Sequence, residues 1–242
     1  MFEGTVFYVP RTDAIRYAAG YLEETGVCVT RSCDPDVTHV LLPIPSFSGG
    51  DEYLAHLLSE LPENVTVCGG NLHSPLLAGY RTVDFLQDAT YLKENAAITA
   101  ECTVQILEER IGKDWSGKKM LIMGWGRIGK CLAPLLLGRG ADVTVSARKD
   151  ADLAAIRALG YNGIHTLHAP EETMDYDVII NTIPAMIIPN LQTKEDAIVL
   201  ELASAAGMAG ENITAARGLP GKMAPKASGQ LIAQTFLRLC IS

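Results

Sequence analysis

The feature that most constrains this chain is a glycine-rich loop that joins an apolar strand to an apolar helix. Residues 118–123 (KKMLIM) are predicted to form a buried strand, and residues 124–129 (GWGRIG) follow directly and open the helix. Glycine permits a tight turn at Gly124, lets the backbone at Gly126 approach a pyrophosphate, and lets the helix pack close to the sheet at Gly129. The N–H groups at the helix N-terminus favour an anion. We therefore expect a Rossmann-type dinucleotide site; a glycine-rich turn without a ligand is the alternative. The residues assigned to the cofactor in this loop are Gly124, Gly126, Arg127, Ile128 and Gly129.

The next predicted strand indicates which nicotinamide cofactor fits. About twenty residues past the glycines, an NAD site carries an Asp or Glu that binds the ribose 2′-hydroxyl. Here the strand predicted over 142–147 ends without an acid. Ser146 can donate a hydrogen bond instead, and Arg148 and Lys149 can pair with a 2′-phosphate. We therefore expect NADP(H) rather than NAD(H). The alternative is that Arg148 and Lys149 are solvated loop charges.

Polar residues stand at the ends of two further predicted strands, 178–181 and 198–202. Open α/β sheets bind ligands at the carboxyl ends of their strands, so these positions are expected to line the ribose and the nicotinamide. Strand-ending turns that satisfy their own backbone groups are the alternative. The residues assigned to the cofactor here are Asn181, Thr182, Ile183, Pro184, Ala203 and Ser204.

Short apolar runs alternate with longer amphipathic ones along the whole chain, which is typical of an α/β fold. Ahead of the glycine loop, four short strands and two helices predict a smaller, flavodoxin-like parallel α/β domain. A helical stretch then leads into the Rossmann domain, and a last helix is expected to pack back toward the N-terminal domain. The predicted boundaries are 1–92 for the N-terminal domain on the substrate side, 93–116 for the linker helix, 117–225 for the Rossmann domain and 226–242 for the C-terminal helix.

Composition and charge narrow the function classes. Hydrophobic residues make up 48% of the 242 residues, which is enough for a sizeable core, and the net charge of −8 would repel a nucleic-acid backbone. The six cysteines form no CxxC motif and no zinc-finger spacing, so we expect free thiols in a reducing cytosol and no metal site. The sequence shows no signal peptide and no apolar run of bilayer length. We therefore expect a cytoplasmic protein that binds neither nucleic acid nor membrane.

Several strings together resemble the family of the dipicolinate synthase A subunit, over about residues 91–240. The most specific string is residues 219–230 (LPGKMAPKASGQ), because a generic dinucleotide domain has no reason to carry it. The other matching strings are residues 95–101 (NAAITAE), 124–129 (GWGRIG), 143–148 (VTVSAR), 180–186 (INTIPAM) and 202–204 (LAS).

The resemblance implies a two-domain oxidoreductase that moves a hydride from a dihydrodipicolinate-type ring to NADP+, which leaves the aromatic dipicolinate. It further implies a branch of lysine biosynthesis that serves sporulation, and a partner that is a flavoprotein, the B subunit. We expect the chain to act on a small dicarboxylate and to form a homo-oligomer. Two alternatives stay open: an NADP-dependent dehydrogenase of another small carboxylate, and a non-catalytic NADP(H)-binding subunit.

The substrate side needs donors that can hold two carboxylates. Lys226 is the first of these, because it stands at a predicted helix start where the N–H groups of Ala227 and Ser228 would complete an anion site. Thr99 and Glu101 are expected to face the cleft from the linker helix, with the Glu orienting a donor or taking a proton. A surface lysine and a capping or solvated pair are the alternatives.

The loops after two strands of the N-terminal domain are also binding positions by topology, although plain turns would carry the same residues. The residues assigned to catalysis are Lys226, Glu101 and Thr99. The residues assigned to the substrate are Ser46, Gly70, Asn71, Lys226 and Ser228.

Overall fold

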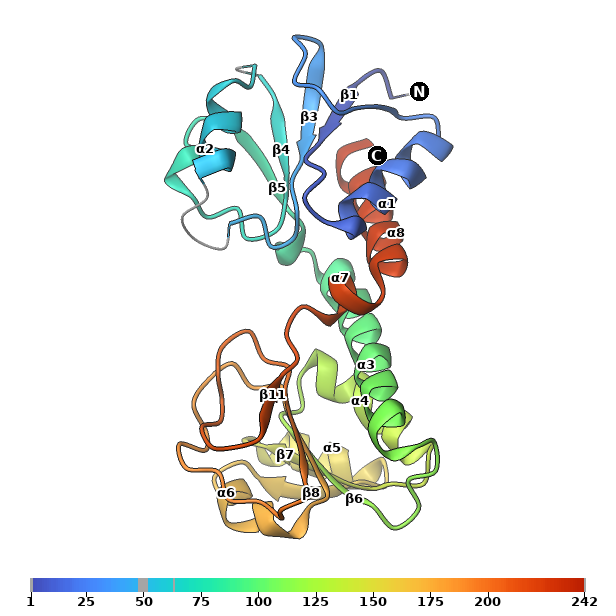
Figure 1. Cartoon of the computed structure of the whole chain (residues 1–242), viewed down its shortest axis with the longest axis vertical. Helices are drawn as coiled ribbons and strands as arrows, with labels where there is room; N and C mark the ends of the chain where they lie inside the picture. Colours follow the sequence, from blue (N-terminus) through green and yellow to red (C-terminus); the bar gives the residue numbers. More distant parts are fainter. Residues whose placement is uncertain (1, 48–51, 63, 242) are drawn as a thin grey trace. The chain divides into compact units, whose positions relative to one another are not determined.

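The computed structural model describes residues 2–47, 52–62 and 64–241, and the chain divides into two compact units (Figure 1). Unit 1 comprises Met1–Asn95 together with Pro220–Ser242, and unit 2 comprises Ala96–Leu219. Each unit is built around one sheet, and every strand pair in both sheets is parallel. Parallel strands joined through helices confirm the predicted α/β class.

Unit 1 contains a five-stranded sheet formed by β1 (Thr5–Tyr8), β2 (Cys28–Thr30), β3 (Val37–Leu41), β4 (Thr66–Gly69) and β5 (Arg81–Asp84). Its helical elements are α1 (Asp13–Glu24), α2 (Glu52–Ser59), η1 (Pro75–Leu77), η2 (Phe85–Gln87), α8 (Pro225–Phe236) and the π-helical turn η4 (Leu237–Ile241). The strand order β2-β1-β3-β4-β5 is the flavodoxin-like order, which confirms the predicted N-terminal fold. Figure 1 shows α2 on one face of this sheet and α1 with α8 on the other.

Helix α1 follows from local sequence signals. Thr12 caps its N-terminus, since the Thr12 hydroxyl oxygen accepts from the backbone N–H of Ile15 at 3.3 Å. Asp13 adds a negative charge to the first turn, where the helix dipole favours it. Gly26 follows the helix with a φ of +84°, a conformation that favours glycine. The buried face of the helix consists of Ala14, Ile15, Ala18, Ala19 and Leu22.

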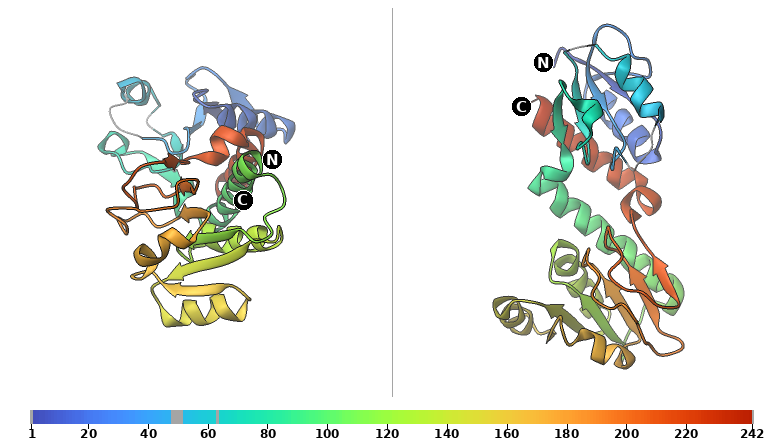
Figure 2. Two further views of the ribbon diagram at one scale, coloured as in Figure 1. Left: turned by 60° about the horizontal axis from the view of Figure 1, so that its bottom comes forward. Right: turned by 90° about the vertical axis from the view of Figure 1, so that its left-hand side faces the viewer.

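The last helix, α8, packs along α1 within unit 1 (Figures 1 and 2). Gly229 makes this close approach possible, because a Cβ there would lie 2.6 Å from the Ala14 carbonyl oxygen and 2.9 Å from the Ala18 backbone nitrogen. Beyond α8, the guanidinium of Arg238 donates to the carboxylate of Asp88 at 2.6 and 3.0 Å. The C-terminal segment is therefore fastened to unit 1 at two places.

Unit 2 contains a six-stranded sheet formed by β6 (Lys119–Met123), β7 (Asp142–Ala147), β8 (Asn162–His165), β9 (Val178–Asn181), β10 (Ile198–Glu201) and β11 (Ile213–Ala215). Its helical elements are α3 (Ala89–Ile111), which begins in unit 1, then α4 (Arg127–Leu137), α5 (Asp150–Ala158), α6 (Ala169–Glu172) and η3 (Thr173–Asp175), and the short α7 (Leu219–Met223) follows β11. The order β8-β7-β6-β9-β10-β11 is the 3-2-1-4-5-6 order of a Rossmann sheet and confirms that prediction.

Each unit has its own apolar core. In unit 1 the core on the α2 side includes Phe7, Val9, Val40, Leu42, Leu54, Leu57, Leu58 and Val67. In unit 2 one core cluster includes Leu121, Met123, Ala169, Tyr176, Ile179, Ile188, Leu191, Val199 and Met208.

The prediction of four strands in the N-terminal sheet is wrong, because it misses the edge strand β5. In the Rossmann sheet the four strands named from the sequence are present, but the edge strands β8 and β11 were not predicted. Each of these strands is half-exposed and has no continuous apolar run. β5 contains Arg81 and Asp84, and β8 contains Asn162 and Gly163. An edge strand has one neighbour instead of two, so its residues need not be apolar.

The predicted linker helix, 93–116, corresponds to α3, which has different ends. The helix begins directly after Asp88, whose carboxylate accepts from the Tyr91 N–H at 2.7 Å. It ends before Gly112, which has a φ of +76°. The right-hand view in Figure 2 shows α3 as one continuous helix.

Across the described ranges, the helices lack the combination of length and apolar character that a bilayer crossing requires. In the same ranges, no group of three or more His, Cys, Asp or Glu side chains is placed to hold a metal ion. All six cysteines are free thiols, of which Cys68 and Cys102 are buried and Cys28 is exposed.

Candidate functional site

The strand order of unit 2 brings two loops together where open α/β sheets bind ligands. β6 and β9 are neighbours, and the chain leaves them in opposite directions across the sheet, toward β7 and toward β10. The crevice at the carboxyl ends of such a pair is the usual ligand position. Thr182, after β9, joins the two loops: its backbone N–H and its hydroxyl donate to the Met123 carbonyl oxygen at 3.0 and 2.9 Å.

Two glycines of the loop after β6 are required by packing within the protein. Gly124 has a φ of +104°, and a Cβ there would lie 2.7 Å from Thr182 Oγ1 and 2.8 Å from Ile183 Cγ1. A Cβ at Gly129 would collide with the carbonyl oxygen of Gly124. Only glycine therefore lets α4 pack this closely against the loop.

Gly126 differs from these two, because a Cβ there would meet no protein atom within 4 Å. Gly126 is the N-cap of α4, and no side chain caps this helix. Its first-turn N–H groups therefore have no capping side chain, and contacts within the protein do not explain the glycine. An open, uncapped helix N-terminus fits a pyrophosphate, which binds such N–H groups and needs the room that glycine leaves. In this first turn Arg127 is exposed and Ile128 is half-buried.

The end of β7 carries the residues predicted to select a 2′-phosphate. Ser146 is fully buried, and its hydroxyl oxygen accepts from Thr166 Oγ1 at 3.4 Å, which places it inside the sheet rather than at its edge. Arg148 and Lys149 are exposed in the turn before α5, and no ion pair or hydrogen bond between described residues uses either side chain. His165 Nε2 lies 3.0 Å from the Arg148 carbonyl oxygen. The turn is thus anchored through its backbone, while both cationic side chains face solvent.

A buried carboxylate links the ends of β9 and β10. Glu201 is 2% exposed, and its Oε1 accepts from Asn181 Nδ2 at 2.8 Å and from the Ala203 N–H at 3.1 Å. Its Oε2 accepts from the Gly207 N–H at 2.8 Å. Asn181, also fully buried, donates to the Ile183 carbonyl oxygen and accepts from the Ile183 N–H, both at 3.0 Å. One carboxylate therefore fixes the turn after β9 and the loop after β10 together.

This network changes the role of the predicted residues in both segments. The side-chain amide of Asn181 is hydrogen-bonded to protein partners. Asn181 therefore fixes the turn instead of lining the cofactor. Ala203 is 3% exposed and contributes mainly its backbone N–H to the network. Glu201 was not among the residues predicted from the sequence, although an acid that ends the otherwise apolar strand IVLE was a usable signal. Of the predicted residues in these segments, the ones that reach the surface are Thr182, Ile183, Pro184 and Ser204.

In unit 1, the predicted substrate residues after β3 and β4 lie together. The buried hydroxyl of Ser46 donates to the Pro43 carbonyl oxygen at 2.7 Å and accepts from the Gly70 N–H at 3.0 Å. The Ser46 N–H donates to the Gly70 carbonyl oxygen at 2.6 Å. Asn71 is exposed with a φ of +60°, and its side chain donates to the Phe47 carbonyl oxygen at 3.1 Å. These groups fasten two loops to each other, which favours the plain-turn alternative for Ser46 and Gly70.

Lys226 and Ser228 lie in the first turn of α8. Lys226 is exposed, whereas Ser228 is buried. The expectation that the Ser228 N–H is free for an anion is wrong, because it donates to the Ala224 carbonyl oxygen at 2.9 Å and so closes the first bond of the helix. The role of the exposed Lys226 ammonium toward a substrate carboxylate stays a prediction.

Thr99 and Glu101 do not share a face of α3. Side chains that are two positions apart on an α-helix differ by about 200° in direction around the helix axis. Accordingly Thr99 is 6% exposed, whereas Glu101 is exposed. The expectation that both side chains face one cleft is therefore wrong.

Comparisons with known proteins show that this chain is similar to one subunit of a known enzyme. No protein-family model matches it. A curated relative, the A subunit of dipicolinate synthase from Bacillus subtilis (strain 168), is 33% identical over 156 residues, and the match covers 60% of this chain and 52% of the relative. The match thus spans about half the length of that relative.

Solved structures extend the likeness to nearly the whole chain. The A subunit of dipicolinate synthase from Bacillus halodurans superposes with a TM-score of 0.83 at 22% identity, covering 98% of this chain and 97% of that one. A transhydrogenase from Sinorhizobium meliloti superposes with a TM-score of 0.67 at 14% identity, covering 99% and 93%. Identities this low show a shared fold, and together with the sequence match they confirm the resemblance to the dipicolinate synthase A subunit.

Proposed function

We propose that this relative of the dipicolinate synthase A subunit is an NADP-dependent oxidoreductase that oxidises a dihydrodipicolinate-type precursor to dipicolinate. Its partner in this proposal is the flavoprotein B subunit. The observation that carries it is the loop after β6, where Gly126 leaves space that no protein atom fills, combined with Arg148 and Lys149 at the position where an NAD site has an acid.

The residues of unit 2 would hold the cofactor as follows. The first-turn N–H groups of α4 bind the pyrophosphate, and Arg148 and Lys149 bind the 2′-phosphate by charge-assisted hydrogen bonds. Bound NADP+ supplies the hydride acceptor. The turn after β9 and the loop after β10, which Glu201 holds together, would form the walls beside the nicotinamide.

The chain itself has a positioning task. Loss of hydride and a proton makes the substrate ring aromatic, so the reaction is favourable and the protein mainly has to align the two reacting carbons. Rigid walls serve that alignment, because a small displacement of the reacting atoms slows the step strongly. Lys226 holds one substrate carboxylate in this proposal.

The first experiment is a titration of the protein with dipicolinate in the presence of NADPH and, separately, of NADH, followed by calorimetry and thermal unfolding. We expect dipicolinate to bind and to raise the unfolding temperature when NADPH is present, with little effect alongside NADH. Cofactor binding without any response to dipicolinate would contradict the substrate assignment.

The 2′-phosphate assignment has its own test in Arg148→Ala. We expect NADPH affinity to fall about tenfold or more, because a charge-assisted hydrogen bond is lost, while NADH affinity is nearly unchanged. Calorimetry with both cofactors measures the difference. Arg157→Ala, at an exposed arginine on α5 of the same unit, is the control for net charge. Equal losses of NADPH and NADH affinity in Arg148→Ala would favour the alternative, in which Arg148 is a solvated loop charge.

One observation favours a second candidate, an NADP-dependent dehydrogenase of another small carboxylate. The polar groups of Ser46 and the side chain of Asn71 are already engaged by their own loops. This arrangement presents fewer hydrogen-bond donors to a dicarboxylate than the sequence predicts. Substituting pyruvate and other small carboxylates for dipicolinate in the same titration separates the two candidates.

A further inference from the structure

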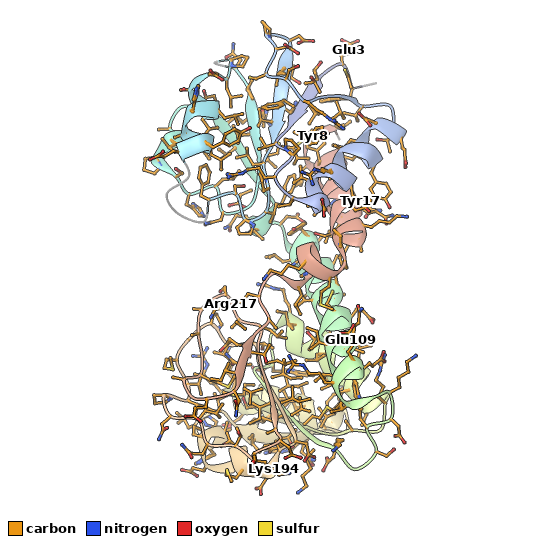
Figure 3. The ribbon with its side chains drawn as sticks, in the orientation of Figure 1. Glu3, Tyr8, Tyr17, Glu109, Lys194 and Arg217 are labelled. Atoms are coloured by element: carbon orange, nitrogen blue, oxygen red, sulfur yellow. The ribbon has the colours of Figure 1, made fainter. Side chains whose placement is uncertain are left out.

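Two thiols meet where the segment after α8 lies on the sheet of unit 1. Cys68 is on β4 and Cys240 is in η4, and their Sγ atoms are 3.6 Å apart although the residues are 172 positions apart in the sequence. Helix α8 leads to this contact, because it packs beside Tyr17 of α1, as Figure 3 shows, and η4 continues from its end. The fold therefore creates a pair of cysteines that no sequence motif indicates.

The face of the sheet around this pair carries a cationic side chain. Thr66 on β4 is the register partner of His39 on β3 and of Arg81 on β5. Side chains two positions apart on a strand point to the same face, so all three residues share the face of Cys68. The ring of His39 contacts that of Phe236 of α8 edge-on, with the ring centroids 5.5 Å apart. The C-terminal helix thus covers the face on which Cys68 lies.

The two thiols differ in access and in acidity. Cys68 is fully buried, whereas Cys240 is half-buried. The hydrogen bond with Cys68 lowers the pKa of Cys240 against the effect of burial, and the nearby Arg81 guanidinium lowers it further. The same hydrogen bond, together with burial, raises the pKa of Cys68. Since oxidants react with the thiolate, Cys240 is the thiol of the pair that a reagent can reach and that reacts first.

We propose that Cys240 and Cys68 form a site of reversible oxidation by a peroxide. The Cys240 thiolate attacks one oxygen of hydrogen peroxide, the O–O bond breaks, and the leaving hydroxide takes a proton to become water, which leaves Cys240 as a sulfenic acid. The Cys68 sulfur then attacks the Cys240 sulfur, the S–O bond breaks, and the oxygen departs as a second water. Two thiols lose two electrons and two protons in total, and one hydrogen peroxide is reduced to two waters.

The disulfide requires only a local movement and would change how the C-terminal segment is held. An S–S bond is about 2.05 Å long, so the two sulfurs approach each other by about 1.5 Å, which side-chain rotation and a small shift of η4 can supply. The bond would tie η4 to β4 covalently, in addition to the ion pair of Arg238 with Asp88. It would also close a loop that contains all of unit 2, so the oxidised chain is expected to unfold at a higher temperature than the reduced one.

The test treats the whole reduced chain with hydrogen peroxide, blocks the remaining thiols and identifies the products by peptide mass. We expect a disulfide-linked pair of peptides that contain Cys68 and Cys240, loss of two of the six free thiols, and recovery of both with dithiothreitol. A disulfide between other cysteines, or no loss of the Cys240 thiol, would overturn the inference. An oxidised protein that unfolds at a lower temperature than the reduced one would also overturn it, because the bond would then form only at the expense of the fold.

Two variants test the order of the two steps. In Cys240→Ser, Cys68 is expected to stay reduced, because a fully buried thiol is out of reach of the peroxide. In Cys68→Ser, Cys240 is expected to react and to remain a sulfenic acid, which dimedone traps. Cys28→Ser, at an exposed cysteine, is the matched control and should form the disulfide like the wild type. Oxidation of Cys68 in Cys240→Ser would contradict the role of Cys240 as the thiol that reacts first.

Discussion

Three glycines stand within six residues in the loop after β6, and each is there for a different reason. Gly124 and Gly129 meet atoms of the protein itself, and Gly124 also has a left-handed φ. Gly126 has an extended backbone, with φ −83° and ψ −165°, that any residue adopts, and it has open space around it. Folding therefore explains two of the three glycines, and the third fits the pyrophosphate of the cofactor that we propose.

This contrast predicts different outcomes for two substitutions. Gly126→Val is expected to cost less than about 1 kcal/mol of stability, because the change affects only an N-cap preference. It should nevertheless abolish NADPH binding, since the side chain would occupy the pyrophosphate position. Gly129→Ala is expected to destabilise the fold by about 1–3 kcal/mol through the clash with Gly124. Urea unfolding measures the stability of both variants, and calorimetry measures NADPH binding. NADPH affinity that persists in Gly126→Val would contradict the assignment of the pyrophosphate to this loop.

At the scale of elements, the pairing of α8 with α1 explains one residue of the string 219–230 in physical terms. Gly229 lies where the two helices approach most closely, and its missing side chain leaves room for the backbone of α1. We expect Gly229→Ala to destabilise the protein by about 1–3 kcal/mol, because the atoms in the way are largely backbone. Gly20→Ala, on α1, is the matched control. No atom lies within 4 Å of its added Cβ, so a gain of about 0.5–1 kcal/mol is expected. A loss at Gly20 as large as that at Gly229 would contradict the packing argument.

The strands and loops of unit 2 also show how far the sequence could predict the structure. The central strands of unit 2 are continuous apolar runs, and their period and length identify them directly. Edge strands such as Ile213–Ala215 lack that signal, because exposed residues on them carry no packing constraint. The glycine loop was predictable because its chemistry lies in six consecutive residues. The hydrogen bond between Asn181 and Glu201 could not be predicted, because it depends on which strands become neighbours in the sheet.

At the scale of the whole molecule, the chain leaves unit 1, forms unit 2 and returns. Asp88 and Arg238 mark this return, because they lie 150 positions apart in the sequence and form a two-pronged ion pair. Asp88 also caps α3 through the Tyr91 N–H. The hydrogen bond from Arg238 and the one from Tyr91 lower the pKa of Asp88 from its ordinary 3.8 to about 2.

The sign of this shift predicts how the pair contributes to stability. A carboxyl group with a lowered pKa in the folded state stabilises the protein fully above its unfolded pKa of 3.8, and the contribution is lost as the pH falls toward about 2. We therefore expect Arg238→Gln to reduce the free energy of unfolding at pH 7 by about 1 kcal/mol or less, as for other partly exposed pairs. The difference from the wild type should shrink between about pH 4 and about pH 2, where Asp88 becomes protonated in both proteins.

Arg16→Gln is the matched control, because its pair with Asp13 is mostly exposed and should contribute nothing measurable. Urea unfolding at several pH values measures both variants. A difference for Arg238→Gln that stays constant from pH 7 to the acid range would show that the arginine acts by packing instead of by its charge on Asp88.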